Sequence, residues 1–134
     1  MIAFADTSAF FALLVRNDCM YERARMIFEQ CMRDEVQLLT SSYVLVETMA
    51  LLQRRVGMNA VMDFHDKIVP LLDIIWVDGE WHAKAMNRLF ILQKREVSLV
   101  DCLSFVIMEM RDLQYAYSFD RHFTAYGFTL LSVP

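Results

Sequence analysis

The sequence is poor in glycine and proline, the two residues that most often interrupt regular structure. Its 134 residues include only 3 glycines and 2 prolines. A sandwich or barrel of many short strands needs frequent turns, so this scarcity argues against such folds and favours helices. The composition, 57% hydrophobic and 22% charged, excludes a disordered or low-complexity chain. We therefore expect a single domain over residues 1–134.

Cysteine pairs, long apolar runs and an excess of basic charge are missing as well. The 3 cysteines form no C-x-x-C motif, and Cys31 and Cys102 fall in apolar helical patterns typical of buried free thiols. Asp6 interrupts the first apolar run, which argues against a signal peptide, and runs such as residues 68–72 are too short to span a bilayer. We expect a reduced, cytoplasmic, soluble protein with no membrane partner. The net charge of −4 argues against passive nucleic-acid binding by a broad basic face, but not against a metal-dependent enzyme that acts on phosphates.

Short apolar segments alternate with helical patterns along the chain. Strands are predicted at residues 2–5, 36–39, 74–77, 115–119 and 129–133. Helices are predicted at residues 9–15, 21–33, 43–56, 59–69 (capped by Asn59), 79–94 (capped by Asp78), 98–110 (opened by a Ser98 capping box) and 120–126. Such alternation is typical of a parallel sheet covered on both faces. We predict an α/β fold, a three-layer α/β/α sandwich with a central, mainly parallel sheet.

Four acidic residues fall where a sheet of this kind binds its ligands, beyond the carboxyl ends of the strands. Asp6 follows the first strand, and Asp120 ends the segment 115–119. Asp101 lies in the first turn of its helix, which should open towards the same edge. Glu47 lies in the second turn of the helix after the second strand, with apolar and aromatic neighbours one turn away on either side. An inward carboxylate without a partner is costly, so Glu47 should be paired, metal-bound or directed into a cleft.

Each acid also has a purely structural interpretation. Aspartates suit helix N-caps and first turns, where the helix dipole favours negative charge. Glu47 has Arg54 and Arg55 as candidate ion-pair partners. Four acids that meet at one edge have no joint structural account, because their repulsion raises at least one pKa unless a divalent cation lies among them. Ligation by oxygen alone favours Mg²⁺ or Mn²⁺.

A cation of this type suits chemistry on phosphates. It lowers the pKa of a bound water and neutralises charge on a scissile phosphodiester. Thr7 and Ser8 add hydroxyls and helix N-terminal N–H groups where a phosphate or a metal-bound water can rest. Arg121, next to Asp120, is a candidate contact for a neighbouring phosphate, with a solvated surface arginine as the alternative.

Five segments occur in a characteristic order along the whole chain. They are DTSAF at residues 6–10, YVLVE at 43–47, SLVD at 98–101, SFDRHF at 118–123 and GFTLL at 127–131. Together they resemble the PIN domain family, and specifically the small toxin ribonucleases of bacterial and archaeal VapBC systems. The last segment is similar to the strand that closes the fold of that family.

The resemblance implies a Mg²⁺- or Mn²⁺-dependent endoribonuclease whose metal-activated water attacks an RNA phosphodiester. The implied acidic cluster, with its supporting hydroxyls, is Asp6, Glu47, Asp101 and Asp120, supported by Thr7 or Ser8 and by Ser118. We expect Asp6 and Asp101 to contact the metal directly, and the other two acids to complete the cluster or orient water. The resemblance also implies a homodimer and a cognate antitoxin as partners. The alternative is a catalytically silent PIN-like module that acts through protein–protein interaction.

Overall fold

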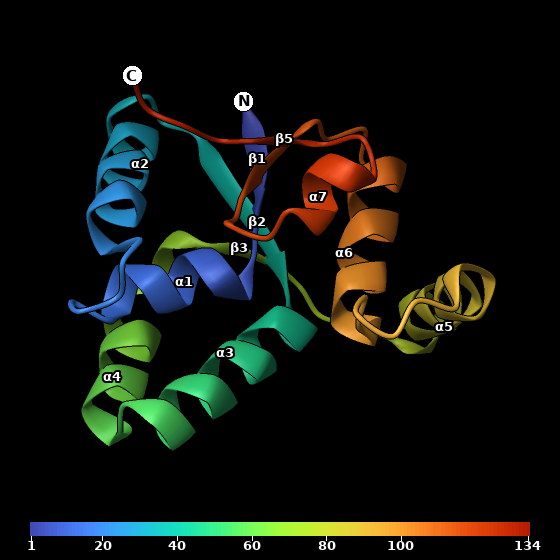
Figure 1. Ribbon diagram of the computed structural model, residues 1–134, viewed down its shortest axis with the longest axis horizontal. Helices are drawn as coiled ribbons and strands as arrows, with labels where there is room; N and C mark the ends of the chain where they lie inside the picture. The colour runs from blue at the N-terminus through green and yellow to red at the C-terminus, as the bar shows by residue number, and fades with distance from the viewer.

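Five short parallel strands form the centre of the protein (Figure 1) in the computed structural model, which describes residues 1–134. The strands are β1 (Ile2–Ala5), β2 (Gln37–Ser41), β3 (Asp73–Ile75), β4 (Tyr115–Tyr117) and β5 (Thr129–Leu130). Their order in the sheet is β3-β2-β1-β4-β5, and every neighbouring pair is parallel. All five strands therefore end at the same edge of the sheet, as a parallel α/β fold requires.

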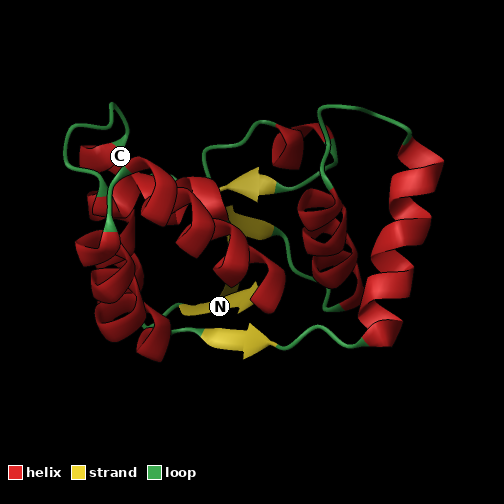
Figure 2. Cartoon of the chain, turned by 90° about the horizontal axis from the view of Figure 1, so that it is seen from below, coloured by secondary structure: helices red, strands yellow, loops and turns green.

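Helices cover both faces of this sheet (Figure 2). They are α1 (Thr7–Leu14), α2 (Tyr21–Arg33), α3 (Ser42–Arg55), α4 (Met58–Asp63), α5 (Gly79–Leu92), α6 (Leu99–Met110) and α7 (His122–Ala125). On one side α1 packs against α2 and α3, and α3 continues against α4; on the other side α5 packs against α6. The predicted three-layer α/β/α sandwich is confirmed. Its helices are all too short or too polar to cross a bilayer.

Aromatic side chains fill the space between the sheet and each helical layer. On the α1 side the ring of Phe10 lies 5.1 Å from that of Phe64 and meets the edge of Tyr117. On the α6 side Phe105 packs edge-to-face on Phe123 with ring centroids 5.1 Å apart. All five side chains are fully buried, and burial of such rings contributes roughly 1.5–3 kcal/mol each. This packing fixes the positions from which the loops at the sheet edge begin.

The prediction of one α-helix over residues 59–69, capped by Asn59, is wrong in detail. The structure starts α4 one residue earlier and then continues with a π-helical turn, Phe64–Ile68, and a 3₁₀ turn, Val69–Leu71. Pro70 lies in the 3₁₀ turn, and a proline there removes a helical hydrogen bond and clashes with the carbonyl four residues before it. The helix therefore changes pitch ahead of Pro70.

The strand predicted at 115–119 ends two residues early, at Tyr117. Beyond it the backbone amides bond to side chains: Phe119 N donates to Ser8 Oγ (2.9 Å), and Asp120 N donates to Ser118 Oγ (3.0 Å). These bonds replace the next rungs of the sheet and turn the chain over its edge. The loop after β4 is thereby attached to the N-terminus of α1.

Candidate active site

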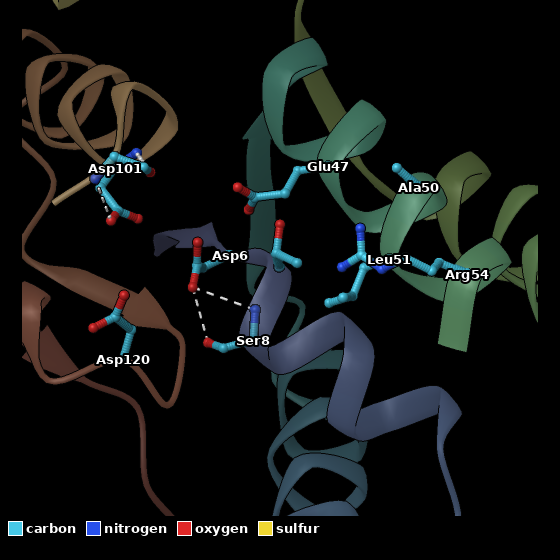
Figure 3. A pocket seen from close by; sticks show the side chains of 10 residues that line it. Asp6, Ser8, Glu47, Ala50, Leu51, Arg54, Asp101 and Asp120 are labelled. Carbon is cyan, nitrogen blue, oxygen red and sulfur yellow. Dashed lines mark hydrogen bonds between the residues drawn. The ribbon is translucent and has the colours of Figure 1, made fainter. Parts of the chain in front are cut away.

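A cleft of about 480 Å³ opens at the carboxyl ends of the strands (Figure 3). All four predicted acids face it. Its ten lining residues are Asp6, Thr7, Ser8, Glu47, Ala50, Leu51, Arg54, Ser98, Asp101 and Asp120. The structure therefore brings Asp6, Glu47, Asp101 and Asp120 together from four separate elements, although their catalytic role stays a prediction.

Asp6 is the most buried of the four acids, with 3% of its surface exposed. It follows β1 and caps α1, and its Oδ2 accepts hydrogen bonds from Ser8 Oγ (2.8 Å), Ser8 N (3.3 Å) and Ser118 Oγ (3.1 Å). None of these bonds reaches Oδ1. Burial raises the pKa of Asp6 from 3.8 to about 6; the bonds from the two serines oppose this, and the charge of Asp101 adds to it. Asp6 therefore caps α1, and its burial makes ionisation of the carboxyl less favourable than it is in water.

Glu47 reaches the cleft from the second turn of α3, a helix capped by Ser41. Burial raises its pKa, the hydroxyl of Thr7 opposes this, and the charges of Asp6 and Asp120 raise it further. The alternative that Glu47 pairs with an arginine of its own helix is wrong, since neither arginine at the end of α3 forms an ion pair. Glu47 therefore forms no ion pair with a cation of the protein, and the charges that shift its pKa belong to acids.

Asp101 forms the predicted capping box at the start of α6. Asp101 N donates to Ser98 Oγ (3.1 Å), and Ser98 N donates to Asp101 Oδ2 (3.1 Å). Burial raises the pKa of Asp101, and the charges of Asp120 and Glu47 raise it further, against the bonds from Ser98. The structural interpretation of Asp101 is confirmed, and it is compatible with the predicted functional one, because the box engages Oδ2 while the side chain still faces the cleft.

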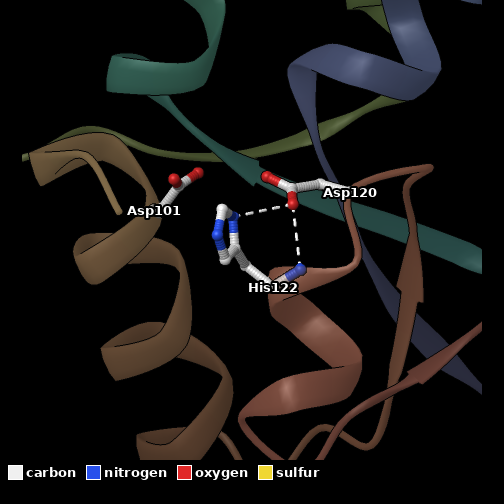
Figure 4. Close-up of side chains that lie close together, drawn as sticks. All are labelled: Asp101, Asp120 and His122. Atoms are coloured by element: carbon white, nitrogen blue, oxygen red, sulfur yellow. Dashed lines mark hydrogen bonds and ion pairs between the residues drawn. The ribbon is translucent and has the colours of Figure 1, made fainter. Parts of the chain in front are cut away.

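Asp120 and His122 form a pair on the far side of the cleft from α3 (Figure 4). His122 N, at the first residue of α7, donates to Asp120 Oδ1 (2.9 Å), although the N-cap residue of α7 is Arg121 and no side chain caps this helix. The ring atom Nδ1 lies at ion-pair distance, 2.9 Å, from the same oxygen, yet it is buried and has no hydrogen-bond partner of good geometry. One ligand atom each from Asp101, Asp120 and His122 lie within 4.8 Å of one another. These three side chains are spaced to share one ion.

No role for His122 was predicted from the sequence. The feature of the sequence that points to one is its position two residues after Asp120, where a turn folds His122 back onto the acid. Ser118, the predicted supporting hydroxyl, is buried and donates to Asp6, although its role in function stays a prediction. Arg121, in contrast, is exposed and does not line the cleft, so the structure does not bring it to the acids. Arg54 lines the cleft instead.

The donor set fits a divalent cation. Four carboxylates and one imidazole converge, and the acids form no ion pair with a lysine or arginine. Burial, and secondarily the neighbouring acids, raise the pKa values of Asp6, Glu47 and Asp101, and no protein cation offsets this. A bound cation would compensate the negative charges and would favour the ionised forms of Asp6, Glu47 and Asp101. Carboxylates bind Mg²⁺ and Mn²⁺, and an imidazole nitrogen adds a ligand that Mn²⁺ accepts more readily than Mg²⁺.

Comparison with known proteins identifies relatives along almost the whole chain. Residues 3–129 match the family model described as PIN domain. The chain is 32% identical over 126 residues to the 23S rRNA-specific endonuclease VapC20 of Mycobacterium tuberculosis, covering 93% of this chain and 94% of that protein.

Solved structures also match almost the whole chain. The crystal structure of M. tuberculosis VapC20, described as a toxin that cleaves the sarcin-ricin loop, matches with a TM-score of 0.88 and 30% identity over 99% of this chain and 100% of that one. Two more distant structures share the fold. VapBC2 of Rickettsia felis, bound to a promoter DNA fragment, has a TM-score of 0.70 at 13% identity, over 98% of each chain. FitAcB of Neisseria gonorrhoeae has a TM-score of 0.67 at 17% identity, over 98% of this chain and 97% of that one.

Proposed function

The chain belongs to the PIN domain family, and we propose that it is an endoribonuclease that hydrolyses RNA phosphodiester bonds with Mg²⁺ or Mn²⁺. The observation that carries this proposal is the convergence of four acids in one cleft without an ion pair to any lysine or arginine. A protein stabilised only by its own contacts gains nothing from such an arrangement, because the acids repel one another. The arrangement becomes favourable when a cation is bound.

We assign the cation to Asp101, Asp120 and His122, and the spacing of their ligand atoms within 4.8 Å of one another supports this, with Asp6 facing the same cleft. When bound, the ion neutralises charge on the scissile phosphate and lowers the pKa of water. Ser8 and Ser118 fix the carboxylate of Asp6, and Ser98 fixes that of Asp101. These residues position the ligands, which in metal sites commonly changes affinity or activity 10–100-fold.

Glu47 is suited to take the proton of the attacking water. Its pKa is raised, which makes it a better base than an exposed glutamate, and it faces the cleft from the side opposite Asp120. In the reaction the water oxygen bonds to phosphorus while Glu47 accepts the water proton, and the leaving oxygen of the RNA departs with the electron pair of the broken P–O bond and takes a proton from solvent. In this proposal Asp6, Asp101 and Asp120 face the cation, and Glu47 transfers the proton.

The relatives suggest the substrate and the partners. VapC20 is named as specific for 23S rRNA, so we propose a structured ribosomal RNA as the first substrate to test. The likeness to toxins of VapBC type supports a toxin that is inhibited by a cognate antitoxin and forms a homodimer. The three free cysteines, two of them buried, fit a reducing, cytoplasmic location.

The test is cleavage of purified 23S rRNA and of total cellular RNA by the full chain with Mg²⁺ or Mn²⁺. Cleavage should vanish with EDTA and in Asp6→Asn, which keeps the size and the capping position of the side chain. Asp66→Asn, an exposed acid outside the cleft, is the matched control and should cleave as the wild type does. Cleavage that survives in Asp6→Asn would exclude this site. A wild type that neither cleaves RNA nor binds the metal would favour the silent protein-interaction module.

A further inference from the structure

One basic side chain lies in a cleft otherwise lined by acids, small polar residues and two apolar ones. Arg54 stands one turn beyond Ala50 and Leu51 on α3, and two turns beyond Glu47, so these residues share one face of the helix. Figure 3 shows the Arg54 side chain extending back over Leu51 towards Glu47 and Asp6. A cation in such a place is expected to pair with an acid.

Arg54 forms no such pair. None of the ion pairs or side-chain hydrogen bonds of the protein includes it, although Glu47 lies on the same helix face. The pKa of Glu47 is raised, whereas a paired guanidinium would lower it. The side chain is exposed at the wall of the cleft, with its donors free for another group. A guanidinium offers five N–H donors in a planar fork that matches a phosphate.

The position of Arg54 relative to the acids indicates which phosphate this is. Arg54 lies seven residues after Glu47, and at 1.5 Å per residue their backbones are about 10 Å apart along the helix. The side chain extends part of the way back, yet it forms no ion pair with any acid, so its guanidinium stays separate from the acidic cluster. Its position suits a phosphate further along the same RNA strand.

We propose that Arg54 binds the RNA backbone at a phosphate away from the cleaved bond and so positions the strand over the acidic centre. The proposal rests on the proposed ribonuclease function. Arg54 is a positioning residue in this account, because it touches the substrate at a distance from the reacting atoms. The contact reads no base, so it contributes to affinity and register and leaves sequence choice to other residues.

The alternative is that Arg54 only stabilises the end of its helix. Both Arg54 and Arg55 lie in the last turn of α3, where positive charge interacts favourably with the helix dipole. Both are exposed and neither forms an ion pair. Only Arg54 lines the cleft. The neighbouring arginine is therefore a control matched in charge, helix position and exposure.

The experiment compares Arg54→Gln, Arg54→Lys and Arg55→Gln in the full chain. Cleavage of purified 23S rRNA gives kcat and KM, and binding of the same RNA to Asp6→Asn, with and without each substitution, is measured over a series of salt concentrations. Arg54→Gln should raise KM about 10-fold, the loss of one charged contact, with kcat within about two-fold. It should also reduce the slope of log affinity against log salt by about 0.7, the value for one phosphate of a single strand. Arg54→Lys should keep the slope and recover part of the affinity.

Arg55→Gln should leave KM and the salt slope at the wild-type values, and its thermal stability should match that of Arg54→Gln. Equal effects of Arg54→Gln and Arg55→Gln on KM and slope would overturn the proposal in favour of a helix-end role. A fall in kcat alone would overturn it too. If the wild type binds RNA without cleaving it, the slopes still decide the role of Arg54 while the ribonuclease function fails. If it binds no RNA, both proposals fail.

Discussion

Ser118 Oγ donates a hydrogen bond to Asp6 Oδ2 over 3.1 Å, and this contact joins two positions 112 residues apart in the sequence. The same hydroxyl accepts the amide of Asp120 (3.0 Å). One buried serine therefore fixes the most buried acid, at the end of β1, relative to the acid that follows β4. The relative positions of Asp6 and Asp120 depend on this side chain as well as on the sheet.

Ser118→Ala should loosen that arrangement without unfolding the protein. The variant leaves the amide of Asp120 without its partner and removes one of the bonds to Asp6. We expect Mn²⁺ affinity, measured by calorimetry, and kcat/KM for RNA cleavage each to fall by about 10-fold or more, as for other residues that orient metal ligands.

Ser104→Ala is the control for Ser118→Ala. Ser104 is buried like Ser118, but its hydroxyl bonds only the carbonyl of Val100 within α6. Its replacement should leave Mn²⁺ affinity unchanged. Equal metal binding in both variants would show that the bond from Ser118 to Asp6 does not organise the site.

The metal-free protein should become less stable as the pH rises from about 4 to about 6. The pKa of Asp6 is raised from 3.8 to about 6, so in this window the folded state binds the proton more tightly than the unfolded state does. Ionisation of Asp6 then costs the folded state up to about 3 kcal/mol by pH 7. Glu47 and Asp101, whose pKa values are also raised, act in the same direction. Urea unfolding in EDTA at a series of pH values measures this slope.

Two further measurements test whether ionisation of Asp6 causes this pH dependence. Asp6→Asn cannot ionise, so its stability in EDTA should depend less on pH over this range than that of the wild type. Addition of Mg²⁺ should stabilise the wild type more at pH 7 than at pH 5, because protons compete with the cation for the acids. A wild-type stability in EDTA that rises from pH 4 to pH 6 would contradict the raised pKa of Asp6.

The convergence of the acids could be predicted because it follows from local rules. Asp6 ends an apolar strand and Asp101 opens a capping box, and each rule fixes a residue at the end of an element. Parallel strands all end at one edge, so residues that follow them meet there. Glu47 was recognisable as an acid on an otherwise apolar helix face.

The position of His122, the π-helical turn and the unpaired Arg54 could not be predicted from local sequence patterns. His122 reaches the acids because the chain turns at Asp120, and the start of that turn is held by the hydroxyl of Ser8, 111 residues away in the sequence. Pro70 indicates that the helix changes ahead of it, but the sequence does not indicate that the change takes the form of a π-helical turn over Phe64–Ile68. The sequence offers Arg54 as an ion-pair partner for Glu47, and the seven-residue spacing on the helix does not indicate whether the two side chains pair.

His122→Ala should change which metal the site prefers. The imidazole adds a nitrogen to a set of oxygen ligands, and nitrogen ligands favour Mn²⁺ over Mg²⁺. We expect the affinity for Mn²⁺ to fall at least about 10-fold and the affinity for Mg²⁺ to fall less, both measured by calorimetry on the full chain. His65→Ala, an exposed histidine away from the cleft, should leave both affinities unchanged. Equal losses for the two metals would mean that His122 only orients Asp120.

Ser98→Ala and Asp101→Asn should separate the structural from the functional role of the capping box. Ser98→Ala removes the acceptor for the amide of Asp101 and should lower the free energy of unfolding by about 1 kcal/mol, while the carboxylate remains to bind metal. Asp101→Asn keeps an oxygen that accepts from Ser98 N, and it removes a charge repelled by Asp120 and Glu47.

The metal-free Asp101→Asn protein should therefore be at least as stable as the wild type, yet bind Mn²⁺ far more weakly and cleave no RNA. The measurements are urea unfolding in EDTA and calorimetric titration of Mn²⁺. If Asp101 has both roles, Ser98→Ala loses stability but still binds Mn²⁺, whereas Asp101→Asn keeps its stability but binds Mn²⁺ far more weakly. If Asp101→Asn instead loses stability like Ser98→Ala and still binds Mn²⁺ at the wild-type affinity, Asp101 is a helix cap alone. The cation would then have to be held by the acids at the ends of β1 and β4.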